Sequence, residues 1–148
     1  MEFEKTTVIA APAARVWQML LDPQLMRDCV PGMESIEVLS DTQYIANLQV
    51  KVSFVSARFK VRTTIVEMRP PQYLRSEGVG EDSSLTSSLK QSSEVFLTDR
   101  GDSTMELRMQ FKIEIFGRLG SFGLDIIKTK ADRMWQEFGR NFTARVQV

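Results

Sequence analysis

Apolar and polar residues alternate along most of the chain, and this period of two predicts β-strands. The clearest strand ends at Ile115, and its apolar face carries Met105, Leu107, Met109, Phe111, Ile113 and Ile115. Similar patterns predict further strands at Glu2–Ile9, Ser35–Ser40, Tyr44–Val52, Phe59–Ile65, Tyr73–Gly80 and Leu85–Thr98. Charged or polar residues occupy the other face of most of them. We therefore expect a curved antiparallel sheet of seven strands with one apolar face.

The C-terminal stretch from Gly117 to about Arg145 has a different period. It lacks proline, and its apolar residues recur at helical spacing: Leu119, Phe122, Ile126, Ile127, Met134, Trp135, Phe138 and Phe142. This pattern predicts one long amphipathic helix, the only element long enough to cover the apolar face of the sheet. Because seven curved strands around one helix need not fill completely, a cavity between them is expected.

Two short helices are expected after the first strand. Pro12 suits the first turn of a helix, and Asp22-Pro23 ends it because the residue before proline avoids the helical region. A second short helical turn follows at Gln24–Asp28. Further along, Ser53–Ala57 interrupts the strands and predicts a turn that exposes Phe54 or Val55. Gly78 and Gly80 predict a bend or bulge in their strand.

Composition narrows the classes of function. The length of 148 residues predicts one domain, 1–148. The 19 basic and 19 acidic residues balance, so the chain has no net positive charge to attract nucleic acid. Histidine is absent and Cys29 is the single cysteine, so neither a zinc or iron–sulfur site nor another cofactor is expected. No apolar run reaches the ~20 residues of a membrane span, and the N-terminus does not resemble a signal peptide. A cytoplasmic protein is expected.

Strand parity and helical spacing select the residues that face the expected cavity. The candidate ligand-binding residues are Leu48, Val50, Phe59, Val61, Thr63, Leu85, Ser87, Leu89, Gln91, Ser93, Met105, Leu107, Met109, Phe111, Phe122, Ile126 and Met134. Two interpretations stay open for each of them, a filled core or a cavity lining. The inward run Ser87, Gln91, Ser93 favours a cavity, because buried polar groups destabilise a protein unless they meet water or a ligand. A shift in strand register would place these three in solvent instead.

Other residues also have two interpretations. Gly117, Gly120 and Gly123 allow either close packing against a strand or a hinge that admits a ligand. Lys130 either extends to the surface or faces the cavity as a cation. The run Arg58, Lys60, Arg62 is either a solvated strand face or a dock for an acidic partner. Trp17 is expected in the core, and Cys29 is expected to be buried and unreactive without a histidine to activate it.

The residues also resemble a known family. The stretches that carry the resemblance are Ala11–Trp17, Leu21-Asp22-Pro23, Cys29–Ser35, Val50–Lys60, Pro70-Pro71 and Gly117–Gly123. With the element order β-α-α-β6-α they are similar to proteins like the G subunit of carbon monoxide dehydrogenase, within the START/Bet v 1-like (SRPBCC) superfamily. The family commonly has glycines where Ser53–Ala57 stands and a cysteine in place of Met33. Many relatives continue into a membrane anchor, whereas this sequence ends at Val148, so membrane contact is expected to be at most peripheral.

The resemblance implies an α+β helix-grip fold with an apolar ligand cavity. It also implies an accessory protein that helps a molybdenum hydroxylase through recruitment, maturation or quinone handling. The first hypothesis is therefore a non-catalytic protein that binds a lipophilic small molecule. The alternative is a small cyclase- or dehydratase-like enzyme that uses polar groups, or a carboxylate such as Glu77, Glu81 or Asp125, in the cavity. A third hypothesis is an assembly factor that acts through its outer surface on hydroxylase subunits.

Overall fold

The computed structural model describes residues 1–82, 84 and 87–146. In this part of the chain seven antiparallel strands form one sheet of order β1-β7-β6-β5-β4-β3-β2. The strands are β1 (Glu2–Ile9), β2 (Met33–Val38), β3 (Gln43–Val52), β4 (Val55–Arg69), β5 (Tyr73–Asp82), β6 (Ser87–Asp99) and β7 (Met105–Gly117). The helices are α1 (Ala13–Leu20), α2 (Pro23–Cys29), the short 3-10 helix η1 (Leu119–Phe122) and α3 (Leu124–Val146). The expected α+β helix-grip architecture is confirmed.

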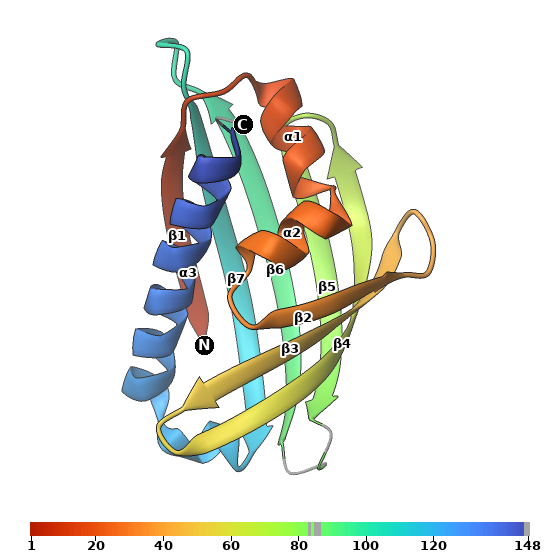
Figure 1. Ribbon diagram of the computed structural model, residues 1–148, viewed down its shortest axis with the longest axis vertical. Helices are drawn as coiled ribbons and strands as arrows, with labels where there is room; N and C mark the ends of the chain where they lie inside the picture. Colours follow the sequence, from red (N-terminus) through yellow and green to blue (C-terminus); the bar gives the residue numbers. More distant parts are fainter. Residues whose placement is uncertain (83, 85–86, 147–148) are drawn as a thin grey trace.

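The helices cover only part of the inner face of the sheet. Figure 1 shows α3 running beside the β1 edge, while α1 and α2 cross the upper part of the sheet and β2 and β3 swing in front of it. Strand parity follows the sequence pattern, since Phe3 and Ile9 of β1 and Met105 and Leu107 of β7 are all buried.

Several predicted boundaries were wrong. The helix predicted from Gly117 begins at Leu124, because β7 runs on to Gly117 and η1 intervenes. Gly117 and Gly123 have φ angles of 83° and 88°, a left-handed conformation that interrupts both strand and helix. The turn predicted over Ser53–Ala57 contains only Ser53 and Phe54, and Val55 is already buried in β4.

The second short helix starts earlier than predicted. Pro23 is its first residue, and the carboxylate of Asp22 accepts hydrogen bonds from the backbone N–H groups of Gln24 and Leu25 at 3.0 and 3.3 Å. Aspartate at this capping position and proline at the first helical position together define the start of α2.

The predicted bulge at Gly78 and Gly80 was also wrong. The pairing of β5 is regular there, and the irregularity lies between Ile65 and Glu67 of β4. The two glycines instead allow close contact. A Cβ atom on Gly78 would lie 2.8 Å from Nε2 of Gln91, and one on Gly80 would lie 2.9 Å from Cγ2 of Val61.

The apolar interior is divided into two clusters. The first lies where α1, α2 and the C-terminal half of α3 meet β1, β6 and β7. It contains Ile9, Ala11, Val16, Trp17, Met19, Cys29, Val95, Leu97, Met105, Leu107, Phe138 and Phe142. The second joins the β3–β4 hairpin to η1 through Val52, Val55, Ala57, Phe59, Val61 and Leu119. The expected core positions of Trp17 and Cys29 are confirmed.

Polar contacts fix α3 to the rest of the fold. The side-chain amide of Asn141 donates to the carbonyl oxygen of Cys29 at 3.0 Å, and Arg145 forms an ion pair with Asp28 of α2. Nearer the middle of the helix, Asp132 forms an ion pair with Lys5 of β1. Helix α3 is therefore attached to α2 at its C-terminal end and to β1 near its middle.

Candidate ligand-binding pocket

An apolar pocket of about 410 Å³ lies between α1–α2 and the inner face of strands β2 to β5. We call it the apolar pocket. Its lining consists of Leu20, Leu21, Asp22, Pro23, Met26, Val30, Met33, Ile36, Val38, Ser40, Asp41, Tyr44, Ile65, Met68, Leu74 and Ser76. A volume of this size matches the small-molecule sites of other proteins, which are mostly apolar with a few fixed polar groups.

The turn between α2 and β2 positions one wall of the pocket. Gly32 has a φ angle of 81°, and its carbonyl oxygen accepts a hydrogen bond from the backbone N–H of Gln49 at 2.8 Å. This contact holds the start of β2 against β3, so Met33 and Ile36 face α2 across the pocket. The Val-Pro-Gly turn in the sequence therefore has a definite structural role.

Two hydroxyl groups, from Tyr44 and Ser76, supply inward polar atoms in the lining. Tyr44 pairs with Thr63 across β3 and β4, and burial raises the pKa of its phenol while a hydrogen bond with Thr63 acts in the opposite direction. The phenol therefore stays protonated at neutral pH and can donate a hydrogen bond. The Oγ atoms of Ser76 and Ser93 lie 2.7 Å apart, within hydrogen-bond distance.

These two hydroxyls belong to a polar layer on the inner face of the sheet. We use this name for Tyr44, Thr63, Ser76, Gln91 and Ser93. Thr63 is buried. Its Oγ1 atom and the Nε2 atom of Gln91 both lie close to Gly78 of β5: a Cβ atom built on Gly78 would be 3.2 Å from the first and 2.8 Å from the second. Gln91 and Ser93, two members of the predicted inward polar run, thus belong to this group of polar side chains, and Ser93 contacts Ser76 of the apolar pocket.

The structure places the other predicted lining residues apart from the apolar pocket. Phe59 and Val61 lie in the second apolar cluster, with Val50, Leu89 and Phe122 packed against it. Met105 and Leu107 lie in the first cluster, with Met109 at its margin. The following residues are half-buried on the inner face or on α3: Leu48, Phe111 and Met134.

Three of the predicted residues need separate comment. Ser87 is buried, and its Oγ atom accepts a hydrogen bond from the backbone N–H of Leu119 at 3.0 Å, so it anchors η1. Ile126 is 47% exposed on α3. Leu85 lies outside the described residues. The prediction that the inner face as a whole lines a ligand cavity stays a prediction.

The lining of the apolar pocket was missed because the cavity was expected beneath the long helix. More than half of the lining comes from residues 20–38, which run from the end of α1 through α2 to β2, and not from α3. A signal was available in Ile36 and Val38, which lie two residues apart and therefore on one face of β2.

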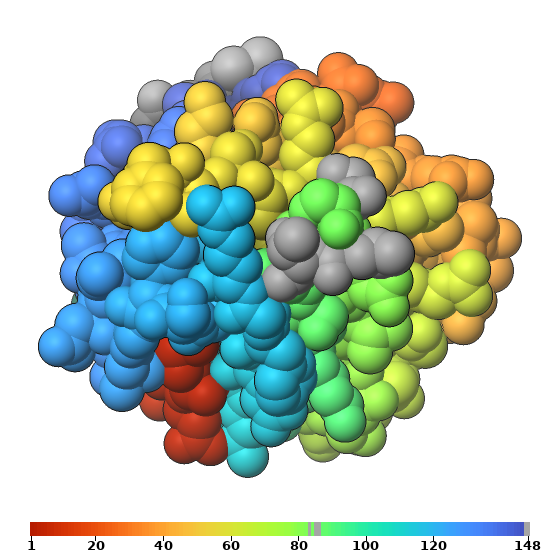
Figure 2. Space-filling model, turned by 90° about the horizontal axis from the view of Figure 1, so that it is seen from below, coloured from red at the N-terminus to blue at the C-terminus, as the bar shows by residue number. Residues whose placement is uncertain are grey.

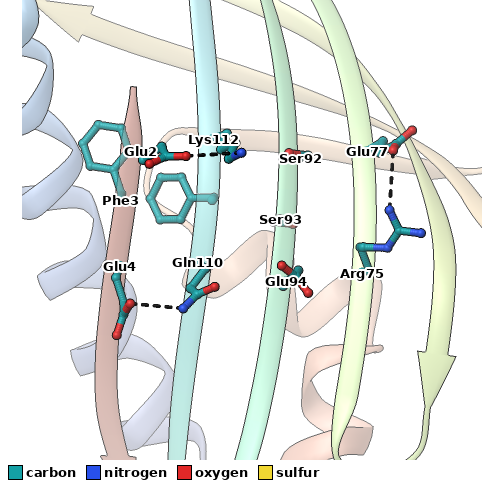
Figure 3. A pocket seen from close by; sticks show the side chains of 11 residues that line it. Glu2, Phe3, Glu4, Arg75, Glu77, Ser92, Ser93, Glu94, Gln110 and Lys112 are labelled. Carbon is teal, nitrogen blue, oxygen red and sulfur yellow. Dashed lines mark hydrogen bonds and ion pairs between the residues drawn. The ribbon is translucent and has the colours of Figure 1, made fainter.

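The enzyme hypothesis in its carboxylate form is contradicted. Glu77, Glu81 and Asp125 are all exposed, and none lines the apolar pocket. Glu77 instead borders a polar depression of about 530 Å³ on the outer face of the sheet (Figure 3). Its charges are largely matched there, with Lys112 3.2 Å from Glu2 and Arg75 3.9 Å from Glu77.

Other forms of chemistry find little support in the side chains. Cys29 is 1% exposed, and burial raises the pKa of its thiol, so the reactive thiolate is scarce. The described residues contain no group of three or more histidine, cysteine, aspartate or glutamate side chains placed to hold a metal ion. Within the same residues, no helix combines the length and apolar character needed to cross a membrane.

The glycines between β7 and α3 are explained by packing and backbone conformation. A Cβ atom on Gly120 would lie 2.3 Å from the carbonyl oxygen of Ile115, so the close-packing interpretation is confirmed at this position. Gly117 and Gly123 adopt positive φ angles. Lys130 is half-buried and borders a shallow groove with Lys51 and Arg133, outside the apolar pocket.

Comparison with solved structures supports the fold. A conserved protein from Geobacillus kaustophilus has a TM-score of 0.91 at 18% identity, covering 99% of this chain and 95% of that one. A START superfamily protein from Mycobacterium smegmatis has a TM-score of 0.74 at 13% identity, covering 99% and 97%. An aromatase/cyclase from Streptomyces sp. R1128 has a TM-score of 0.68 at 18% identity, covering 99% and 93%. At these identities the likeness shows the fold alone.

Comparison at the level of sequence identifies the family. No curated protein matches the chain. Residues 6–147, however, match the CoxG family, which is described as the G subunit of carbon monoxide dehydrogenase. That match spans the helix-grip fold from β1 to the end of α3, including every residue of the apolar pocket. The chain belongs to the CoxG family of carbon monoxide dehydrogenase proteins.

Proposed function

We propose that this protein is a non-catalytic accessory protein that binds a lipophilic small molecule in the apolar pocket. The observation that carries the proposal is the pocket of about 410 Å³ between α1–α2 and the sheet, lined mainly by aliphatic and methionine side chains. Transfer of apolar surface from water into such a space is favourable by roughly 25 cal/mol per Å². Flexible methionines such as Met26, Met33 and Met68 would adapt to ligands of different shape.

The hydroxyls of Tyr44 and Ser76 would orient a ligand in the pocket. A ligand with one polar end would place it at Tyr44 and Ser76 and leave its apolar body against α2 and β2. Because the phenol of Tyr44 is protonated at neutral pH, it would donate to a carbonyl or hydroxyl oxygen of the ligand. Thr63 and Ser93, which belong to the same polar layer, would hold the hydroxyls of Tyr44 and Ser76 in place.

Family membership supports an accessory role beside an enzyme of the carbon monoxide dehydrogenase type, which is a molybdenum hydroxylase. In such a role the ligand would be a quinone or another lipid. The protein would supply the enzyme with quinone, or assist the recruitment or the maturation of the enzyme. We propose hydroxylase subunits as partners on this basis.

Ligand binding is directly testable by titration. Short-chain ubiquinone and menaquinone analogues and a fatty acid are the probes. Trp17 packs in the cluster that includes the lining residues Leu20, Met26 and Leu74, so its emission should respond to an occupied pocket. We expect saturable quenching with at least one probe. If no probe gives saturable quenching, the carrier proposal fails.

A variant that fills the pocket should weaken this binding. Ile36→Trp adds bulk at a half-buried position on the edge strand β2, and we expect the affinity measured by calorimetry to fall about tenfold or more. Val8→Trp is the matched control because Val8 is 44% exposed on the other edge strand, β1, and does not line the pocket. Equal affinity in both variants, with circular dichroism showing both folded, would place the ligand elsewhere.

A further inference from the structure

The apolar pocket meets solvent between the α1–α2 junction and the β2–β3 hairpin. The exposed residues of its lining mark this opening, and we define the rim of the pocket as Leu21, Asp22, Val38, Asp41 and Met68. Figure 1 shows the α1–α2 junction and the β2–β3 hairpin on the same side of the molecule. A ligand would therefore pass the rim before it reaches the inner face of the sheet.

The other end of the molecule has a different packing. Figure 2, which views that end, shows the yellow β3–β4 turn beside the blue segment that leads into α3. The ring centroids of Phe54 in the turn and Phe122 in η1 lie 6.1 Å apart, and Phe122 packs against the second apolar cluster. These contacts belong to that cluster, whereas the apolar pocket opens at the rim.

The charged side chains in the lining of the pocket are both negative. They are Asp22 and Asp41, and the lining contains neither lysine nor arginine among the residues that the structure describes. Arg27, the basic residue of α2, does not line the pocket and lies 3.7 Å from the carboxylate of Asp28. A negatively charged ligand would thus meet carboxylates at the rim and find no cation in this lining.

Asp22 also occupies the N-terminus of α2. Its carboxylate accepts hydrogen bonds from the backbone N–H groups of Gln24 and Leu25 at 3.0 and 3.3 Å. Unpaired N–H groups at the start of a helix attract anions. Because the protein's own carboxylate already takes this place, the start of α2 offers nothing to an anionic ligand in the pocket.

We propose that Asp22 and Asp41 are specificity-determining residues that exclude anionic lipophiles from the apolar pocket. This inference rests on the proposed function of the pocket and adds the charge of its ligand. A fatty acid with its carboxylate at the rim would be repelled by two like charges. With its carboxylate at the hydroxyls of Tyr44 and Ser76, it would lose its hydration without gaining a cation.

An uncharged lipophile meets neither obstacle. Its carbonyl or hydroxyl oxygen can accept a hydrogen bond from the protonated phenol of Tyr44, and such a group is much less costly to desolvate than a carboxylate. Selection then comes from the difference between two affinities, and repulsion of the wrong ligand contributes to it as much as attraction of the right one.

A matched pair of ligands tests the proposal. Decanoate and decanamide have the same chain and a similar head shape, and they differ in charge. Calorimetric titration of the full chain at neutral pH measures both affinities. We expect decanamide to bind about tenfold more tightly than decanoate, or more.

Removal of the negative charge at the rim should reduce the ratio of these two affinities. Asparagine caps a helix about as well as aspartate, so Asp22→Asn keeps the start of α2, and Asp41 is exposed in a turn. We expect Asp22→Asn combined with Asp41→Asn to lower the ratio about threefold. Asp41→Lys, which places a cation at the rim, should lower it about fivefold or more.

A control variant removes the same total charge away from the pocket. Glu37 and Glu81 are exposed on β2 and β5 and do not line the pocket. Glu37→Gln combined with Glu81→Gln should therefore leave the ratio of the two affinities unchanged. A fall equal to that in the Asp22 and Asp41 variant would contradict a local effect of the rim.

The possible failures are distinguishable. Equal affinities for the two compounds, or tighter binding of decanoate, would overturn this inference and leave the pocket as a site for lipophiles. An unchanged ratio in all the Asp22 and Asp41 variants, with circular dichroism showing that they are folded, would also overturn it. Binding of neither compound and of no quinone analogue would overturn the proposed function itself, and this inference with it.

Discussion

Replacing Gly32 by alanine is expected to lower the free energy of unfolding by about 3 kcal/mol. A Cβ atom at this position would lie 2.2 Å from the backbone carbonyl oxygen of Gln49, and the φ angle of 81° is unfavourable for any residue with a side chain. Relief of the clash requires movement of β2 away from β3. Because β2 supplies Met33 and Ile36 to the apolar pocket, ligand affinity should fall together with stability. Urea unfolding followed by circular dichroism measures the first effect.

Gly101→Ala separates the clash from the backbone conformation. Gly101 has nearly the same φ angle, 79°, but an added Cβ atom would meet nothing within 4 Å. We expect this control to cost about 1 kcal/mol, the conformational part alone. Equal losses of stability in the two variants would show that Gly32 is not in close contact with β3.

Phe142→Ala is expected to cost about 3–5 kcal/mol of unfolding free energy. Phe142 is 0% exposed in the first apolar cluster, and its ring centroid lies 5.3 Å from that of Phe138. Its removal would leave a cavity where α3 meets α1 and the sheet. Thermal unfolding by differential scanning calorimetry measures the loss, and the midpoint should fall accordingly.

Phe116→Ala provides the reference for Phe142. Phe116 is 54% exposed on β7, so its truncation should change stability by no more than about 0.5 kcal/mol. A small effect at Phe142, similar to that at Phe116, would contradict the placement of Phe142 in a closely packed part of the first cluster.

Most of the fold follows from sequence periodicity. The inward face of β7, from Met105 to Ile115, and the stripe on α3 that includes Phe138 and Phe142 could both be identified because burial on one face imposes a fixed period. Boundaries were less predictable. The left-handed φ angles of Gly117 and Gly123, which separate β7 from α3, depend on a local conformation that glycine permits and does not require.

The position of the pocket could not be predicted in the same way. The alternation of residues along a strand shows which face points inward. It does not show where the helices leave that inward face uncovered. Phe59 and Val61 are inward and packed, whereas Tyr44 and Ser76 are inward and reach the apolar pocket. The difference arises because Phe59 and Val61 pack in one cluster with Leu119 of η1, whereas Tyr44 and Ser76 face the space between the sheet and α1–α2. That tertiary arrangement has no local sequence signature.

The hydrogen-bonding role of single polar residues was equally hidden. Ser87 and Ser93 have the same parity on β6. Ser87 nevertheless accepts a hydrogen bond from Leu119 at the start of η1, and Ser93 bonds to Ser76 beside the pocket. The partner that satisfies a buried hydroxyl decides its role, and that partner comes from another part of the chain.

The central claim is that the apolar pocket, and not the middle of the inner face, receives the ligand. Methionine methyl groups report on both places, because Met26, Met33 and Met68 line the pocket while Met105, Met109 and Met134 lie on the inner face and α3. The most direct measurement is a carbon-13 methyl NMR titration of the methionine-labelled protein with a short-chain menaquinone analogue. Our account predicts saturable shifts at Met26, Met33 and Met68. Shifts confined to Met105, Met109 and Met134 would contradict it.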